Sequence, residues 1–111
     1  MADVIARESV FGTRPGGNRF AIEVSVRKPF RVDGLAVEEW ICPLTLSPLF
    51  GEVRDVHGNS SLQALCLALS LAVDALENFK ADGGSLTYED GNEYDLWSLS
   101  FTAAASRFGV A

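Results

Sequence analysis

The feature that most constrains this sequence is a long apolar segment with a start signal and a stop signal. Ser60 and Gln63 form a capping box, in which the serine hydroxyl accepts from the Gln63 amide and the glutamine side chain reaches back. Gly83-Gly84 supplies a left-handed stop at the other end. The sequence therefore predicts one helix from Ser60 to about Asp82, roughly 33 Å long at about 1.5 Å per residue.

Two apolar stripes run along this helix. We expect the first stripe, whose members recur with helical spacing, to pack on a sheet; it comprises Leu62, Leu65, Cys66, Leu69, Val73, Leu76 and Phe79. The second stripe would then lie on the far side, where a surface helix is normally polar. It is the interface candidate, and it comprises Ala64, Leu67, Ala68, Leu71 and Ala75. Three occupants could cover it: the chain's own tail around residues 97–108, a second copy, or a different protein.

The rest of the chain predicts strands. Residues 4–12 and 19–28 flank a turn-rich segment, which indicates an antiparallel hairpin. Residues 37–46 predict a third strand that ends at Ser47-Pro48, and Pro43 within it indicates an edge or bulge position because it lacks an amide hydrogen. Residues 50–56 alternate poorly and predict a short fourth strand, and residues 85–89 predict another.

From about residue 96 the pattern fits both a strand and a helix, and we favour a strand followed by a loose or helical end. The length of 111 residues predicts one domain, 1–111. The fold class that follows is α+β: an antiparallel β-sheet of about four to five strands with one long α-helix packed across one face.

Several segments resemble a family of small bacterial proteins that carry a domain of unknown function. The resemblance covers roughly residues 4–89, and its motifs are Glu39-Trp-Ile-Cys-Pro43, Asp55-Val-His-Gly58, Ser60-Ser-Leu-Gln-Ala-Leu65, Leu67-Ala-Leu69 and Asp82-Gly-Gly-Ser-Leu86. It implies a meander of strands followed by a helix that opens with a serine-x-glutamine-alanine-leucine pattern. It implies no chemistry.

The net charge and the two cysteines indicate which partners the protein can bind and in which cellular compartment it lies. The chain has 9 basic and 15 acidic residues, and a net charge of −6 disfavours binding to nucleic acid. The apolar runs are shorter than the roughly 18 residues that cross a bilayer, and the start of the chain does not resemble a signal peptide. We therefore expect a cytoplasmic protein without a membrane partner, in which Cys42 and Cys66 are free and buried.

His57 is the only histidine, and it allows one catalytic hypothesis. Together with Asp55 and a nearby serine or cysteine it could build a hydrolase-like triad. However, these residues belong to one short loop, and no G-x-S-x-G motif is present. Both cysteines lie on faces that we expect to be buried, where a thiol is inert. We therefore interpret His57 as a structural residue in the turn before the helix and favour a protein that is not an enzyme.

The helix start allows a second alternative. Ser60 and Ser61 place hydroxyls and amides at a helix N-terminus, which favours anions, and Arg54 is the adjacent cation. The acidic stretch at residues 89–95 lacks the spacing of a calcium loop, so we expect a solvated turn or a patch for a basic partner. We expect no metal and no cofactor.

The leading functional hypothesis is a non-catalytic protein-interaction module, either a homodimer or a protein of the immunity or accessory type. The alternatives are a small hydrolase that uses His57 and Asp55, or an anion-binding module at the helix start. The sequence does not identify a small ligand or a protein partner.

Overall fold

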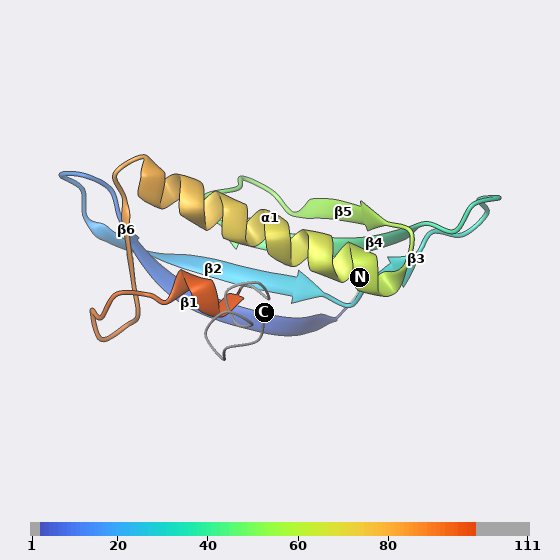
Figure 1. Ribbon diagram of the computed structural model, residues 1–111, viewed down its shortest axis with the longest axis horizontal. Helices are drawn as coiled ribbons and strands as arrows, with labels where there is room; N and C mark the ends of the chain where they lie inside the picture. The colour runs from blue at the N-terminus through green and yellow to red at the C-terminus, as the bar shows by residue number, and fades with distance from the viewer. Residues whose placement is uncertain (1–2, 100–111) are drawn as a thin grey trace, which may run out of the picture.

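The computed structural model of this protein describes residues 3–99, which form one antiparallel sheet with one long helix lying along one of its faces (Figure 1). The strands are β1 (Val4–Thr13), β2 (Arg19–Arg27), β3 (Phe30–Arg31), β4 (Trp40–Ser47), β5 (Arg54–Gly58) and β6 (Ser85–Thr87). The helices are α1 (Ser61–Ala81) and the short 3-10 helix η1 (Leu96–Leu99). The predicted α+β class is confirmed, and the sheet has six strands because the short strand β3 joins the five that the sequence predicts.

The order of the strands places β1 and β5 on opposite sides of the sheet. Strand β1 pairs with β2, β2 pairs with β4, and β4 pairs with β5. Trp40 and Ile41 pair with both β3 and β5, so these two strands lie on opposite edges of β4. Pro43 lies opposite the break between β2 and β3, because Leu44 pairs with β2 and Ile41 pairs with β3.

The orientation of α1 differs from the prediction. The residues that pack on the sheet are Ala64, Ala68, Ala72, Leu76 and Phe79. Ala64 and Ala68, predicted on the far side, are 0% exposed, whereas Leu62 of the predicted sheet-facing stripe is 68% exposed. The predicted assignment of the two stripes is therefore wrong for the first half of the helix, whereas Leu76 and Phe79 of the sheet-facing stripe are buried as predicted. The alanines allow the helix to approach the sheet closely, and the larger leucines spread to the flanks.

The other members of the interface candidate lie away from the core centre. Leu67 is 45% exposed, and Leu71 and Ala75 are half-buried. Within the described residues, α1 is long and apolar enough to cross a membrane by length and composition alone. In this fold it lies against the sheet, and its buried side chains join one core with Ile22, Leu44 and Leu46.

Two further predictions need correction. The fourth strand runs over Arg54–Gly58 rather than residues 50–56, so His57 lies on a strand and not in a turn. Leu96–Leu99 form a 3-10 helix where a strand was favoured, and the predicted loose or helical end at residues 100–111 lies outside the described residues. Cys42 and Cys66 are free as predicted; Cys42 is buried and Cys66 is half-buried.

Candidate interaction site

The catalytic candidates do not form a triad. His57 and Asp55 lie two residues apart on β5, and the imidazole Nδ1 lies 2.8 Å from Oε1 of Glu39. Cys42 pairs with Val56 and His57 pairs with Ile41, so Cys42 and His57 point to opposite faces of the sheet. The Cys42 thiol donates to the carbonyl of Arg27 at 3.4 Å, and burial raises the pKa of this thiol.

The anion-binding candidates are also separated. The Ser60 hydroxyl accepts from the Gln63 amide at 3.0 Å, and the Gln63 side chain accepts from the amide of Asn59, which is the predicted capping box. Ser61 is exposed in the first turn of α1. Arg54 lies at the opposite end of β5, and its guanidinium stacks on the ring of Phe50 at 4.2 Å. The structure therefore does not bring Arg54 to the helix start.

The acidic stretch forms a turn that other residues hold in place. The Asp90 carboxylate accepts from the backbone amide and the side chain of Asn92 at 2.9 and 3.0 Å. Lys80 Nζ lies 3.7 Å from Glu93 Oε1. Over residues 3–99, no three histidine, cysteine or acidic side chains gather in a way that could hold a metal ion.

A groove that sequence reasoning missed lies between the sheet and one flank of α1. Its volume is about 420 Å³. Strands β1 and β2 form its floor, α1 forms one wall, and Ser98 and Leu99 of η1 also line it. The lining is mainly apolar and comprises Ala6, Arg7, Glu8, Val24, Ser25, Val26, Leu69, Ala72, Ser98 and Leu99.

The strand beside this groove has an open edge. Strand β1 pairs with β2 over its whole length, but on its other side only Phe11, Gly12 and Thr13 pair with β6. Over residues 4–10, β1 therefore has no strand partner on that side within the described part of the chain. Such an edge presents backbone N–H and C=O groups that can accept another strand.

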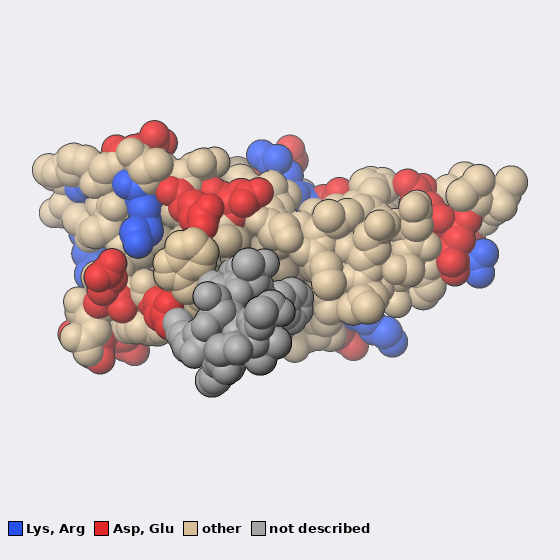
Figure 2. Space-filling model, in the orientation of Figure 1, with Lys and Arg blue, Asp and Glu red and all other residues tan. Residues whose placement is uncertain are grey.

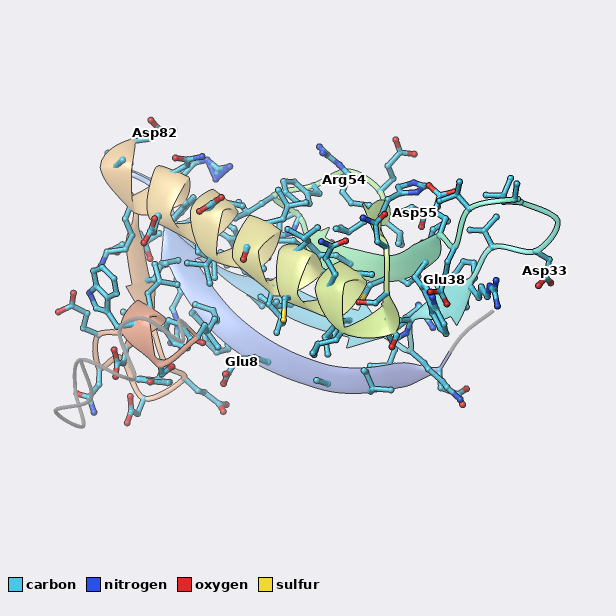
Figure 3. The ribbon with its side chains drawn as sticks, turned by 45° about the vertical axis from the view of Figure 1, so that its right-hand side comes forward. Glu8, Asp33, Glu38, Arg54, Asp55 and Asp82 are labelled. Atoms are coloured by element: carbon cyan, nitrogen blue, oxygen red, sulfur yellow. The ribbon has the colours of Figure 1, made fainter. Side chains whose placement is uncertain are left out.

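Charge is distributed unevenly around the groove. Residues 61–73 of α1 contain no charged side chain, and Figure 2 shows this half of the helix as an uncharged expanse. Acidic side chains gather towards η1, where Glu89, Asp90, Glu93 and Asp95 follow β6. Glu8 lies on β1 at this end of the groove (Figure 3) and accepts a hydrogen bond from the hydroxyl of Tyr94 at 3.2 Å.

The sequence contained only a weak signal for this site. Residues 4–9 of β1 are all exposed except the half-buried Val4, which is unusual for a strand with two neighbours. In the sequence, this exposure corresponds to the polar run Arg7-Glu8-Ser9 near the middle of β1. Whether an edge is open depends on strand pairing that is distant in the sequence, so local patterns do not reveal it.

No curated protein and no solved structure matches this chain. Residues 8–97 match a family described as a domain of unknown function, DUF6968, and this match spans β2 to β6 together with most of β1 and the start of η1. The chain therefore belongs to the DUF6968 family.

Proposed function

We propose that this protein is a non-catalytic interaction module that binds an extended apolar segment of a basic partner protein. The segment adds as a strand to the open edge of β1 at residues 4–10. The single observation that carries the proposal is this open edge beside an apolar groove of about 420 Å³. In strand addition, main-chain hydrogen bonds supply affinity and pockets for alternate side chains supply specificity. We include in this proposal that the protein has an accessory or immunity-type role, in which it acts by binding its partner.

The composition of the groove supports an apolar segment. Val24 and Val26 of β2 form its floor, and Leu69 of α1 forms its wall. A bound strand has side chains that alternate between two faces, so every second side chain would project on the helix side of the sheet, beside the apolar groove. The remaining side chains would face the outer surface of the sheet beside Arg7.

The charge supports a basic partner. The chain carries a net charge of −6, and four acidic residues lie between β6 and η1, close to the end of the groove. Charge complementarity of this kind raises association rates and suppresses wrong partners. Basic residues that flank the apolar segment would therefore lie beside Glu8 and the acidic turn.

A second copy of this chain is disfavoured at the β1 edge in the registers centred on the two charged residues of the strand. An antiparallel pair of identical strands must be centred on one residue, which then faces its own copy. Centring the pair on Arg7 or on Glu8 would place like charges directly opposite each other, which is destabilising. A different sequence avoids this repulsion.

The free cysteines support a cytoplasmic location, which we include in the proposal. Cys42 and Cys66 remain unpaired in the fold. Free thiols of this kind are usual in reducing compartments.

The test uses a synthetic peptide of alternating valine and threonine with two lysines at each end. We expect the peptide to shift the backbone amide resonances of residues 4–10 in the full-length protein. A peptide with glutamates in place of the lysines should bind at least about tenfold more weakly, because the acidic turn repels it. If neither peptide shifts these resonances, the proposal is wrong.

A matched pair of variants locates the binding. Ala6→Trp places a large ring in the mouth of the groove and should abolish the shifts. Ala21→Trp places the same ring on the outer face of β2, where Ala21 is also exposed, and should leave binding unchanged. If the peptide binds only after residues 100–111 are deleted, the groove belongs to the chain's own C-terminal segment, and the assignment to a partner protein fails.

A further inference from the structure

We propose that two copies of this chain associate through β5, in an antiparallel register centred on Val56. The two sheets then join into one continuous sheet across a two-fold axis. This inference concerns the edge opposite the β1 groove and does not depend on the proposed function. It rests on the pattern of charges along β5 and on the apolar flank of α1 above it.

Strand β5 is an edge strand. It pairs with β4 from Arg54 to Gly58, and within residues 3–99 no other strand pairs with it. Figure 3 shows Arg54 and Asp55 on this edge, on the other side of α1 from Glu8. The outer side of β5 therefore presents backbone groups that a further strand can pair with.

The sequence of β5 is complementary to itself in one register. In a two-fold antiparallel pair, residues at equal distances from the central residue face each other. When Val56 is central, Asp55 faces His57 of the partner subunit, and His57 faces Asp55 of the partner subunit. The same contact therefore occurs twice. Registers centred on Asp55 or on His57 instead place identical polar side chains opposite each other, which is less favourable.

The side chains of Asp55 and His57 are free to contact a second copy. Asp55 and His57 are both exposed and point to the same face of the sheet, since they lie two residues apart on one strand. The side chain of Asp55 makes no hydrogen bond or ion pair with the other described residues. His57 contacts Glu39 through Nδ1, so Nε2 can donate to the carboxylate of the partner's Asp55 when the imidazole is protonated and both ring nitrogens carry hydrogen.

The flank of α1 above β5 is apolar. Leu69 lines the groove on the β1 side, and Leu71 lies about 200° further around the helix, so Leu71 faces the β5 side. Leu67 lies on the same flank and is 45% exposed. A two-fold axis perpendicular to the sheet keeps both helices on the same side of the joined sheet. The two flanks then face each other across the axis and add apolar contact to the strand pairing.

This arrangement explains part of the second helical stripe. Ala64 and Ala68 belong to the core, but Leu67, Leu71 and Ala75 remain on the flank that faces the axis. Contact with a second copy would remove this apolar flank from water and would pair the open edge strand below it. Charge complementarity at the Asp55 and His57 positions is what selects a second copy over an unrelated strand.

The first experiment exchanges the two charges. Asp55→Lys places like charges opposite the partner's His57 when the histidine is protonated, and His57→Glu places two carboxylates opposite each other. Each variant alone should dimerise roughly tenfold more weakly than the parent chain, measured by sedimentation equilibrium across a concentration series. An equimolar mixture of the two variants should form a heterodimer preferentially, because both cross-strand contacts become attractive again.

The mixture distinguishes the specific register from a general charge effect. Asp33→Lys makes the same change of charge on an exposed loop residue and should leave the dimer unchanged. Thermal unfolding of each variant checks that it is folded before its mass is measured. A parent chain of 12.0 kDa at every concentration, or a mixture without preferential heterodimers, overturns the proposal.

A second measurement does not depend on the charge variants. Directly opposed residues of an antiparallel pair have Cα atoms about 4.5–5.5 Å apart, which is within the range of a disulfide. Val56→Cys should therefore form a covalent dimer on mild oxidation, in a Cys42→Ala, Cys66→Ser background that removes the thiol of Cys42, which pairs with Val56 within the chain. Asp55→Cys in the same background should not, because each Asp55 position faces position 57 instead of itself. Equal cross-linking of both variants, or of neither, contradicts the register centred on Val56.

Discussion

The backbone of Gly58 lies so close to Ala64 that no side chain fits between them. A Cβ atom on Gly58 would lie 2.5 Å from the amide nitrogen of Ala64 and 2.8 Å from its Cα. Gly58 ends β5 and Ala64 lies in the first turns of α1, so this contact fixes the position at which the helix returns over the sheet. The position of α1 over the sheet in turn decides which side chains of the helix face the β1 groove and which face the β5 edge.

The first prediction is that Gly58→Ala destabilises the fold. The added methyl group meets backbone atoms, which cannot move aside as a side-chain end can. We expect a loss of about 1–3 kcal/mol in the free energy of unfolding, measured by urea denaturation. Gly51→Ala is the matched control, because a Cβ at Gly51 meets nothing within 4 Å. Equal losses for the two variants would mean that the close approach is absent in solution.

The second prediction concerns the orientation of α1. Ala68→Leu inserts a larger side chain between the helix and the sheet, where Ala68 is 0% exposed, and should cost about 1–3 kcal/mol of stability. Leu62→Ala removes a side chain that is 68% exposed and should change stability by no more than about 0.5 kcal/mol. Chemical denaturation of both variants measures the difference. The reverse ranking would support the orientation that the leucine stripe predicted.

The fold class followed from local signals that the structure preserves. Ser60 and Gln63 cap the helix as predicted, and the glycines at its end stop it near Asp82. Apolar and other residues alternate along β2, and this local pattern matches the buried face that contains Ile22, Val24 and Val26. These elements could be predicted because each depends on residues close together in the sequence.

The orientation of α1 could not be predicted because the helix is apolar on more than one side. Hydrophobic periodicity identifies a buried face only when the opposite face is polar. In residues 61–73 both stripes are apolar, so the choice depends on how closely the helix approaches the sheet. Alanine at positions 64, 68 and 72 allows the closest approach, and that packing outweighs the larger leucine side chains.

The interaction edges could not be predicted for a related reason. The open part of β1 and the edge position of β5 both result from which strands pair, and β6 is more than seventy positions from β1 in the chain. Strand β5 ends at Gly58, whereas the predicted strand ended at residue 56, so His57 lies on the strand and not in a turn. Asp55 and His57 are therefore neighbours on one face of the sheet.

The third prediction is that Arg19 holds the segment after β6 against the sheet. Its guanidinium donates to the carbonyl oxygens of Tyr88 at 3.3 Å and Glu89 at 2.8 Å, and it lies 4.1 Å from the ring centroid of Phe11. Arg19→Ala should increase amide hydrogen exchange in residues 85–95 and cost about 1 kcal/mol of global stability. Arg31→Ala, at another exposed arginine, should change neither. Unchanged exchange in Arg19→Ala would show that the segment is held by other contacts.

The fourth prediction concerns the stability of the fold at high pH. Tyr94 is 2% exposed, and its hydroxyl donates to Glu8. Burial, and then the negative charge of Glu8, raise the pKa of Tyr94 above its ordinary value. The folded state therefore holds the phenolic proton more tightly than the unfolded chain does. The resulting stability is fully present below about pH 10, the ordinary tyrosine pKa, and is lost as the pH rises above it.

Two variants separate this effect from other alkaline titrations. Tyr94→Phe cannot ionise, so its free energy of unfolding should fall less steeply above about pH 10 than that of the parent chain. Tyr88→Phe leaves Tyr94 as the only tyrosine, and its ultraviolet absorbance then reports the ionisation of Tyr94 directly. Adding Glu8→Gln should move that ionisation to lower pH, because the neighbouring negative charge is removed. An ionisation that Glu8→Gln leaves in place would show that Glu8 does not contribute and that burial alone raises the pKa of Tyr94.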